Sequence, residues 1–299
     1  MAESQEKIGN WGRWGTDDER GALNLLTPDV VRAAAAVIKT GKVYSLSLPI
    51  QRDGIPLIPY RNAPLRLTMF NGMDKEMFQA YGAVDVGANE DFLALPSHTA
   101  THMDALCHVY ANDMLYNGHP NTSANTREGA TRCGIDKARH IVGRAVLLDM
   151  ALYFGVEYVE PPRIFTSADL LGCAAKEGVE IRQGDILLLR TGWLRIFFED
   201  PERWAQGQPG IGKDACNLIQ ERDIVAVGAD NNAVEAIPFD DNEFLGVHVK
   251  LLRDLGVPLL ELLPLDELAA DKVYESLLVV APLMVTGGMG SPVNPIAIA

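Results

Sequence analysis

Cysteine is scarce in this chain, and its four residues form no Cys-x-x-Cys pair. They stand far apart along the sequence, at positions Cys107, Cys133, Cys173 and Cys216. This spacing excludes a disulfide framework and a zinc ribbon, since both need paired or closely spaced cysteines. We therefore expect reduced, mostly buried thiols and a cytoplasmic protein.

Long hydrophobic runs and positive charge are also missing. The apolar run at 277–285 is too short to span a bilayer, and residues 1–7 lack the apolar core of a signal peptide. Lysine and arginine number 26 against 40 aspartates and glutamates, for a net charge of −14. This acidic balance argues against nucleic acid or a membrane as a partner and leaves a small molecule as the expected ligand.

The composition is that of an ordinary globular protein, with 47% apolar and 22% charged residues over 299 positions. We expect an N-terminal arm at 1–26 and a single domain at 27–299. The arm is rich in glycine and polar residues and carries Trp11 and Trp14. Their rings need a packing surface, either on the chain's own domain or in a pocket, its own or a neighbour's.

Helices and strands alternate through the second half, which favours an α/β fold. A threonine cap and a proline predict a helix at 27–39, and alternation predicts a strand at 43–48. Three prolines predict a loop at 51–76, where Phe70 in the apolar tip can border a pocket. Further strands are expected at 145–150, 185–190, 224–229, 258–262 and 277–285, and further helices at 167–178, 213–222 and 244–255.

The segment 97–108 holds three of the chain's six histidines together with one aspartate. Imidazole and carboxylate are ligands that divalent metals prefer. A single helix would turn Asp104 away from His98 and His102. A single strand would hold the two histidines about 13 Å apart, too far for one ion. If these three side chains bind one metal, the chain must therefore bend across 99–101.

His108 lies four residues after Asp104, about one helical turn further on. It is close enough to act on an activated water as a general base without being a ligand. The alternative for every histidine here is an ordinary core or surface residue.

The pattern His98-x-x-Thr-His102-x-Asp104-x-x-x-His108 resembles the signature of the metal-dependent cyclase/hydrolase family, which includes bacterial kynurenine formamidase and isatin hydrolase. The usual form of that signature is His-x-Gly-Thr-His-x-Asp-x-Pro-x-His-Phe. This chain keeps the ligand types and spacing and departs at three positions, Ala100, Leu106 and Val109. The departures concern the shape of the loop and the fit of the substrate.

A second segment resembles the C-terminal part of the same family. His248, and Glu261 in an apolar run, match the histidine and glutamate that complete its active site. A carboxylate in such surroundings costs several kcal/mol unless it is paired or binds a metal; the alternative is that Glu261 faces water. In family members with two metals this pair helps to hold the second ion.

The resemblance implies a swivelling β/β/α fold with a mixed central sheet and a Zn²⁺- or Mn²⁺-dependent hydrolase of a small non-peptide amide or cyclic amide. His98, His102 and Asp104 would hold the metal, with His248 and Glu261 added for a second one. His108, Glu261 and His248 would be the catalytic residues, and the aromatic side chains Trp11, Trp14 and Phe70 would contact the substrate. It also implies a homodimer or homotetramer.

Three alternatives remain at this point. A lyase or cyclase could use the same ligands, and two histidines with one carboxylate also form the iron site of non-haem oxygenases. The remaining alternative is a binding protein that keeps the metal without catalysis.

Overall fold

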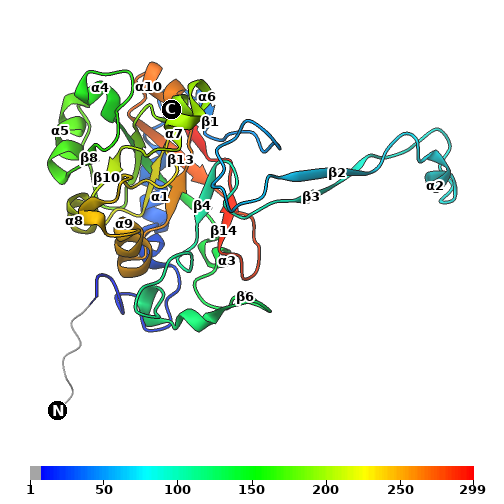
Figure 1. The fold of residues 1–299 in the computed structure, drawn as a ribbon, viewed down its shortest axis with the longest axis horizontal. Helices are drawn as coiled ribbons and strands as arrows, with labels where there is room; N and C mark the ends of the chain where they lie inside the picture. Colours follow the sequence, from blue (N-terminus) through cyan, green and yellow to red (C-terminus); the bar gives the residue numbers. More distant parts are fainter. Residues whose placement is uncertain (1–7) are drawn as a thin grey trace, which may run out of the picture.

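The computed structural model describes residues 8–299 and is built on a nine-stranded mixed sheet, which confirms the predicted α/β class (Figure 1). The strand order is β1-β15-β13-β7-β9-β11-β12-β4-β14. These strands are β1 (Val43–Ser45), β4 (His102–Asp104), β7 (Ile141–Asp149), β9 (Ile186–Arg190), β11 (Ala226–Ala229), β12 (Leu259–Glu261), β13 (Glu275–Val280), β14 (Gly290–Pro292) and β15 (Ile296–Ile298). Two short strand pairs lie outside this sheet. β8 (Ile164–Phe165) pairs in parallel with β10 (Gly210–Ile211), and β5 (Ala124–Asn125) pairs antiparallel with β6 (Gly129–Ala130).

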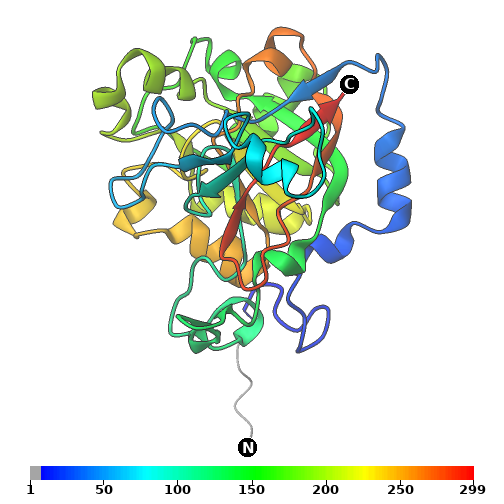
Figure 2. The ribbon, with the colours of Figure 1, turned by 90° about the vertical axis from the view of Figure 1, so that its right-hand side faces the viewer.

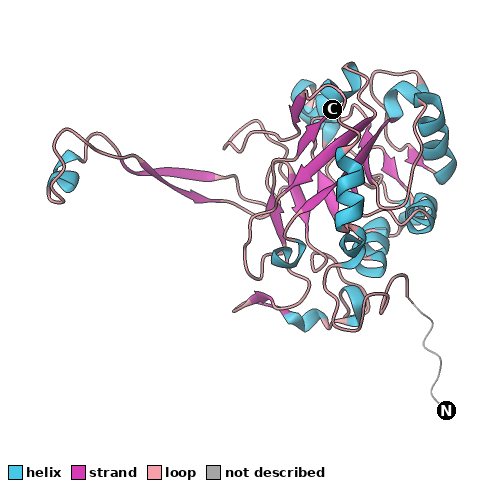
Figure 3. Cartoon of the chain, turned by 180° about the vertical axis from the view of Figure 1, so that it is seen from behind, coloured by secondary structure: helices cyan, strands magenta, loops and turns pink. Residues whose placement is uncertain are grey.

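Helices pack around this sheet, and Figure 3 shows α1 lying across it. The α-helices are α1 (Pro28–Ala35), α2 (Lys75–Gln79), α3 (Ile135–Ala138), α4 (Met150–Phe154), α5 (Ser167–Glu177), α6 (Leu194–Glu199), α7 (Pro201–Trp204), α8 (Lys213–Glu221), α9 (Gly246–His248) and α10 (Asp266–Ala270). Short 3-10 helices are η1 (Gly21–Leu25), η2 (Tyr116–Gly118), η3 (Asn121–Ser123) and η4 (Asp240–Asn242), and η5 (Val249–Leu255) is a π-helix.

The parallel centre of the sheet consists of β7, β9, β11 and β12. Parallel strands are covered on both faces, so they read as continuous apolar runs. Leu187, Leu188 and Leu189 of β9 are fully buried accordingly. The outer strands pair antiparallel. At one edge β4 lies between β12 and β14, and these three strands carry the candidate site described below.

The prediction of a loop over 51–76 is wrong. Strand β2 (Leu65–Phe70) pairs with β3 (Glu90–Ala94), and α2 caps the hairpin at its far end. Figures 1 and 3 show this hairpin projecting from the body of the molecule, and in Figure 2 it points toward the viewer. Its strands are exposed on both faces, so they lack the alternation that marks a half-buried strand. The partner strand also lies twenty residues downstream, out of reach of a local pattern.

Other element boundaries shift for local reasons. Thr27 caps α1 as predicted, accepting a hydrogen bond from the N–H of Val30 (3.3 Å), but the helix ends at Ala35. The last predicted strand stops at Val280, two residues before Pro282, which has no N–H to donate. The helix predicted over 244–255 is divided between α9 and the wider turns of η5.

Part of the predicted N-terminal arm packs on the body of the chain. Residues 1–7 lie outside the described residues. Ala22 and Leu23 are buried in the main core, and Asn10 donates a side-chain hydrogen bond to the carbonyl of Leu255 (2.9 Å). The division into an arm at 1–26 and a domain at 27–299 stays a prediction. Across residues 8–299, each helix is too short or too polar to cross a membrane.

Glu177, at the end of α5, provides a test of the packing. Its carboxylate accepts a hydrogen bond from the N–H of Asp149 (2.8 Å), and its second oxygen is buried without a partner. Burial raises the pKa of Glu177 to about 7. Because the folded chain holds this proton more tightly than the unfolded chain, its contribution to stability is complete below pH 4.5 and is lost as the pH rises through 7.

We therefore expect the unfolding free energy of the wild type, relative to Glu177→Gln, to fall by about 1–2 kcal/mol between pH 4.5 and 8, after allowance for solvent screening. Urea unfolding at several pH values measures this difference. Glu221→Gln, at an exposed position of α8, is the control and should show no such trend. A pH-independent difference for Glu177→Gln would contradict the account of this carboxyl.

Candidate metal centre

Strand β4 brings ligand-type side chains together through its register. His102 and Asp104 are two residues apart on β4, so their side chains lie on the same face. On one side β12 places Glu261 directly opposite His102. On the other side β14 places Gly290 opposite Asp104. Directly opposed residues share a face of the sheet, so three ligand-type side chains gather at one place.

The chain bends just before β4. Ala100 has φ of 51°, a left-handed conformation that costs a residue other than glycine about 1–2 kcal/mol. The bend brings the ring centroid of His98 to 5.3 Å from that of His102. A hydrogen bond to the end of β12 stabilises the bend, since the hydroxyl of Thr101 donates to the carbonyl of Leu262 (2.5 Å). This is the bend that the spacing of the histidines requires.

The side chains converge on Asp104. The Nε2 atoms of His98 and His102 lie 3.4 and 3.8 Å from its Oδ1. The Nε2 of His248 lies 3.7 Å from its Oδ2. Glu261 completes the group, at 3.1 Å from His102 Nε2 and 3.4 Å from His248 Nε2. Segments 98–104, 248 and 261, distant in sequence, thus form one buried cluster.

Two sets of ligand atoms within this cluster are compact enough to hold an ion. His98, Asp104 and His108 form the first set, and His102, Asp104 and Glu261 form the second. In each set the ligand atoms lie within 4.8 Å of one another. The sequence assigned His98, His102 and Asp104 to one ion; the structure brings all three together but divides them between two sets that share Asp104.

The polar atoms of the cluster fit a divalent cation. Both oxygens of Asp104 and the Nε2 atom of His98 are buried without a hydrogen-bond partner, and the Nε2 atom of His102 faces the carboxylates of Glu261 and Asp104. A buried carboxylate without a partner costs several kcal/mol. Imidazole nitrogen and carboxylate oxygen are also the donors that zinc and similar ions bind. A cation beside Asp104 would offset this cost.

The outward-facing nitrogens fix the orientation of two imidazoles. His102 donates from Nδ1 to the carbonyl of Ala100 (2.8 Å), and His248 donates from Nδ1 to the buried carboxylate of Glu235. Each contact leaves the Nε2 atom facing Asp104. Carboxylate or carbonyl partners of this kind commonly orient metal-binding histidines.

The charge states follow from these contacts. Burial lowers the pKa of His248, but its hydrogen bonds with Glu235 and Glu261 outweigh burial and raise that pKa to about 10. Burial raises the pKa of Glu261, but hydrogen bonds with His102 and His248 outweigh it and hold that pKa far below its usual range. Burial lowers the pKa of His108, which keeps this imidazole neutral and able to accept a proton.

Sequence reasoning missed two residues that shape the cluster. A Cβ at Gly290 would lie 2.5 Å from Nε2 of His98, so only glycine leaves room for this imidazole. Glu235 was also missed, and its one available signal was an acidic residue within the apolar segment 233–237. No local pattern links Glu235 to His248, thirteen residues away.

Three aromatic residues predicted to contact the substrate lie elsewhere. Trp11 donates from Nε1 to the carbonyl of Arg253 (2.7 Å) at η5. Trp14 packs beside a neighbouring arginine. Phe70 lies on the projecting hairpin, with its ring 5.5 Å from that of Phe78. Within residues 8–299, the structure brings none of these three side chains to the cluster.

Comparison with known proteins agrees with this geometry. The family model described as "Putative cyclase" matches residues 44–236, more than half of the chain. An isatin hydrolase from Roseibium aggregatum is 25% identical over 219 residues, which cover 70% of this chain and 74% of that protein.

Among solved structures, one described as a novel cyclase superposes with a TM-score of 0.89 at 36% identity and covers 98% of each chain. Isatin hydrolase A from Labrenzia aggregata shares the fold, with a TM-score of 0.61 at 20% identity over 86% of this chain and 93% of that one. The predicted cyclase-like fold is confirmed by these superpositions. The chain therefore belongs to the cyclase family, and its relatives include an isatin hydrolase.

Proposed function

We propose that this protein is a divalent-metal-dependent hydrolase of a small non-peptide amide or cyclic amide, such as an aryl formamide or an isatin-like C–N bond. The observation that carries the proposal is the convergence of buried, unpartnered ligand atoms on Asp104. The resemblance to isatin hydrolase over most of both chains supports the substrate class.

Zn²⁺ or Mn²⁺ is the proposed cofactor, since imidazole and carboxylate suit both ions. Following the two compact sets of ligand atoms, His98 and Asp104 would hold one ion, and His102, Asp104 and Glu261 would hold a second. His248 would complete the second set beside Glu261. A bound divalent ion lowers the pKa of a water molecule toward ~7 and polarises a carbonyl oxygen. Glu261 lies in one compact set with His102 and Asp104, which favours a ligand over a proton acceptor.

His108 is the proposed general base. Its ring centroid lies 4.1 Å from that of His98 and 6.5 Å from that of His248, so it borders the cluster. It is more exposed than the other histidines of the cluster. Neutral His108 would accept the proton of the attacking water and return it to the leaving nitrogen. Glu235 would keep His248 in place during the reaction.

Replacing His108 separates a base from a ligand. His108→Ala should keep the metal content and the substrate affinity of the wild type, while kcat falls about 10²–10⁴-fold because a proton transfer is lost. The acidic limb of the pH–rate profile should also flatten. Elemental analysis and steady-state kinetics under nitrogen, on aryl formamides and isatin, measure these quantities.

His140→Ala, at an exposed position, is the matched control and should behave as the wild type. Loss of metal in His108→Ala would make His108 a ligand. Full kcat in His108→Ala would show that His108 is not the general base. If the wild type requires Fe²⁺ and dioxygen for activity, the protein is an oxygenase and not a hydrolase.

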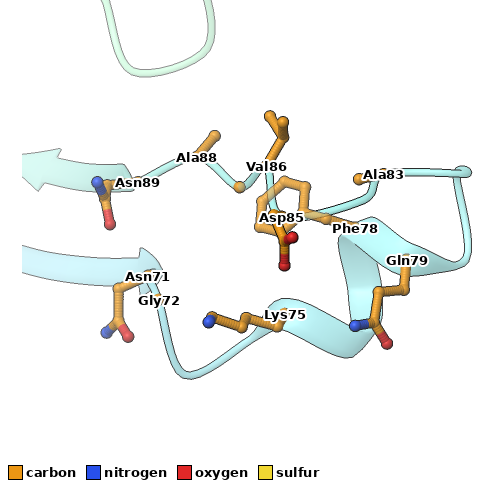
Figure 4. A pocket seen from close by; sticks show the side chains of 11 residues that line it. Asn71, Gly72, Lys75, Phe78, Gln79, Ala83, Asp85, Val86, Ala88 and Asn89 are labelled. Atoms are coloured by element: carbon orange, nitrogen blue, oxygen red, sulfur yellow. The ribbon is translucent and has the colours of Figure 1, made fainter.

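We further propose a homodimer or homotetramer in which the β2–β3 hairpin packs against a second copy. Large apolar side chains along the hairpin are exposed, among them Met73 (91%), Tyr81 (88%) and Val84 (81%). A hollow at its tip is lined by Phe78 and Val86 (Figure 4). An isolated two-stranded hairpin is marginally stable in water, and exposed apolar patches of this kind mark interaction surfaces.

Leu67 and Phe92 stand opposite each other on this hairpin and are each half exposed. The double variant Leu67→Lys/Phe92→Glu keeps a favourable cross-strand pair but removes apolar contact area. We expect it to shift the assembly toward monomer, as measured by light scattering after gel filtration. Leu152→Lys, on α4, should leave the mass unchanged. A monomeric wild type, or an unaltered mass in the double variant, would contradict this proposal.

A cytoplasmic location is also part of the proposal. All four cysteines are free and buried, which is typical of proteins in reducing compartments.

A further inference from the structure

Arg61 lies between the metal cluster and the base of the projecting hairpin. Its Nη1 donates a hydrogen bond to the carbonyl oxygen of His98 (3.1 Å), the residue that supplies the first ligand of the cluster. The side chain is half-buried, and its guanidinium carbon lies 5.8 Å from the ring centroid of Tyr60. Only one of its five N–H donors is used by a described side-chain or backbone partner.

No carboxylate within residues 8–299 forms an ion pair with Arg61. The contrast with Arg144 is informative, because that buried guanidinium pairs with Asp185 (2.6 Å) and Glu275 (2.7 Å). The guanidinium of Arg61 is only partly buried, so its remaining N–H donors can bind an anion from solution. Acidic residues outnumber basic ones in this chain, 40 to 26, yet no described carboxylate pairs with Arg61. An anionic group of a ligand can take that place.

Arg61 lies on one side of the cluster. Its hydrogen bond to the carbonyl oxygen of His98 (3.1 Å) places it beside this residue, and the ring centroid of His108 lies 4.1 Å from that of His98. Arg61 therefore stands on the side of the cluster where these two histidines lie. Its charge adds to that of any bound divalent ion, so an anion placed there is attracted by both.

We propose that Arg61 forms a carboxylate-binding subsite beside the metal cluster, an inference that rests on the proposed function. Guanidinium binds carboxylate through two parallel N–H···O bonds, which fix its orientation as well as its position. The carboxylate has two possible sources. It is a substituent of the substrate, or it is the group that amide hydrolysis creates from the scissile carbonyl.

The test uses binding as well as turnover. Benzoate and the neutral benzamide serve as probes, titrated calorimetrically into zinc-loaded protein whose metal content has been measured. Arg61→Gln should weaken benzoate binding about 10–100-fold, as expected for the loss of charge-assisted hydrogen bonds, and should leave benzamide binding unchanged. Arg61→Lys keeps the positive charge but lacks the planar guanidinium. Its benzoate affinity should lie between those of the wild type and Arg61→Gln.

Arg66→Gln is the control, since Arg66 is an exposed arginine on β2 paired with Asp91 (2.9 Å). It should bind both probes as the wild type does. Equal benzoate affinity in Arg61→Gln and the wild type would overturn the inference. An equal loss of benzamide binding would also overturn it, because Arg61 would then shape the site without recognising charge. If Arg61→Gln does not fold, an Arg61→Lys variant with unchanged benzoate affinity overturns it as well.

Kinetics distinguish the two sources of the carboxylate. If the substrate carries it, Arg61→Gln should raise KM for 2-formamidobenzoate about 10-fold or more and leave KM for formanilide unchanged. If the product carries it, both KM values stay constant while inhibition by benzoate weakens. Calorimetry needs no turnover. If Arg61→Gln weakens benzoate binding as expected but the wild type hydrolyses no amide, the result counts against the proposed function and not against the subsite.

Discussion

The buried carboxylate of Asp104 is the constraint on which the rest of the site depends. It lies on a three-residue strand, is 1% exposed, and finds no hydrogen-bond donor for either oxygen. Such a charge is costly in a folded chain unless a cation compensates it. The Nε2 atoms of His98, His102 and His248 lie around it, and that of His98 also lacks a hydrogen-bond partner. The protein is arranged to hold a positive ion at this point.

The sheet supplies the precision of this arrangement. The register of β4 with β12 sets Glu261 against His102, and the register with β14 provides Gly290, whose missing side chain gives His98 its room. The bend at Ala100 turns His98 back toward the strand that follows it. The proposed metal ligands and their orienting partners thus depend on backbone geometry at the edge of the central parallel strands.

The local part of this site could be predicted from the sequence, and the non-local part could not. Spacing within 98–108 was sufficient to require a bend and to separate the roles expected of Asp104 and His108. The roles of Gly290 and Glu235 could not be predicted, because their contacts with His98 and His248 form only when distant segments meet. The hairpin could not be predicted for a different reason. Its strands are exposed on both faces, so the burial that creates a periodic pattern is absent within a single chain.

The central claim is that Asp104 and the residues around it bind a divalent metal ion, and elemental analysis of the wild type and Asp104→Asn tests it most directly. Asparagine keeps the size of the side chain and removes the charge, so the fold can be checked by circular dichroism and thermal melting. The account predicts at least one Zn²⁺ or Mn²⁺ per chain in the dialysed wild type and strongly reduced metal in a folded Asp104→Asn. Equal metal content in both proteins, or a catalytically active wild type without metal, would contradict it.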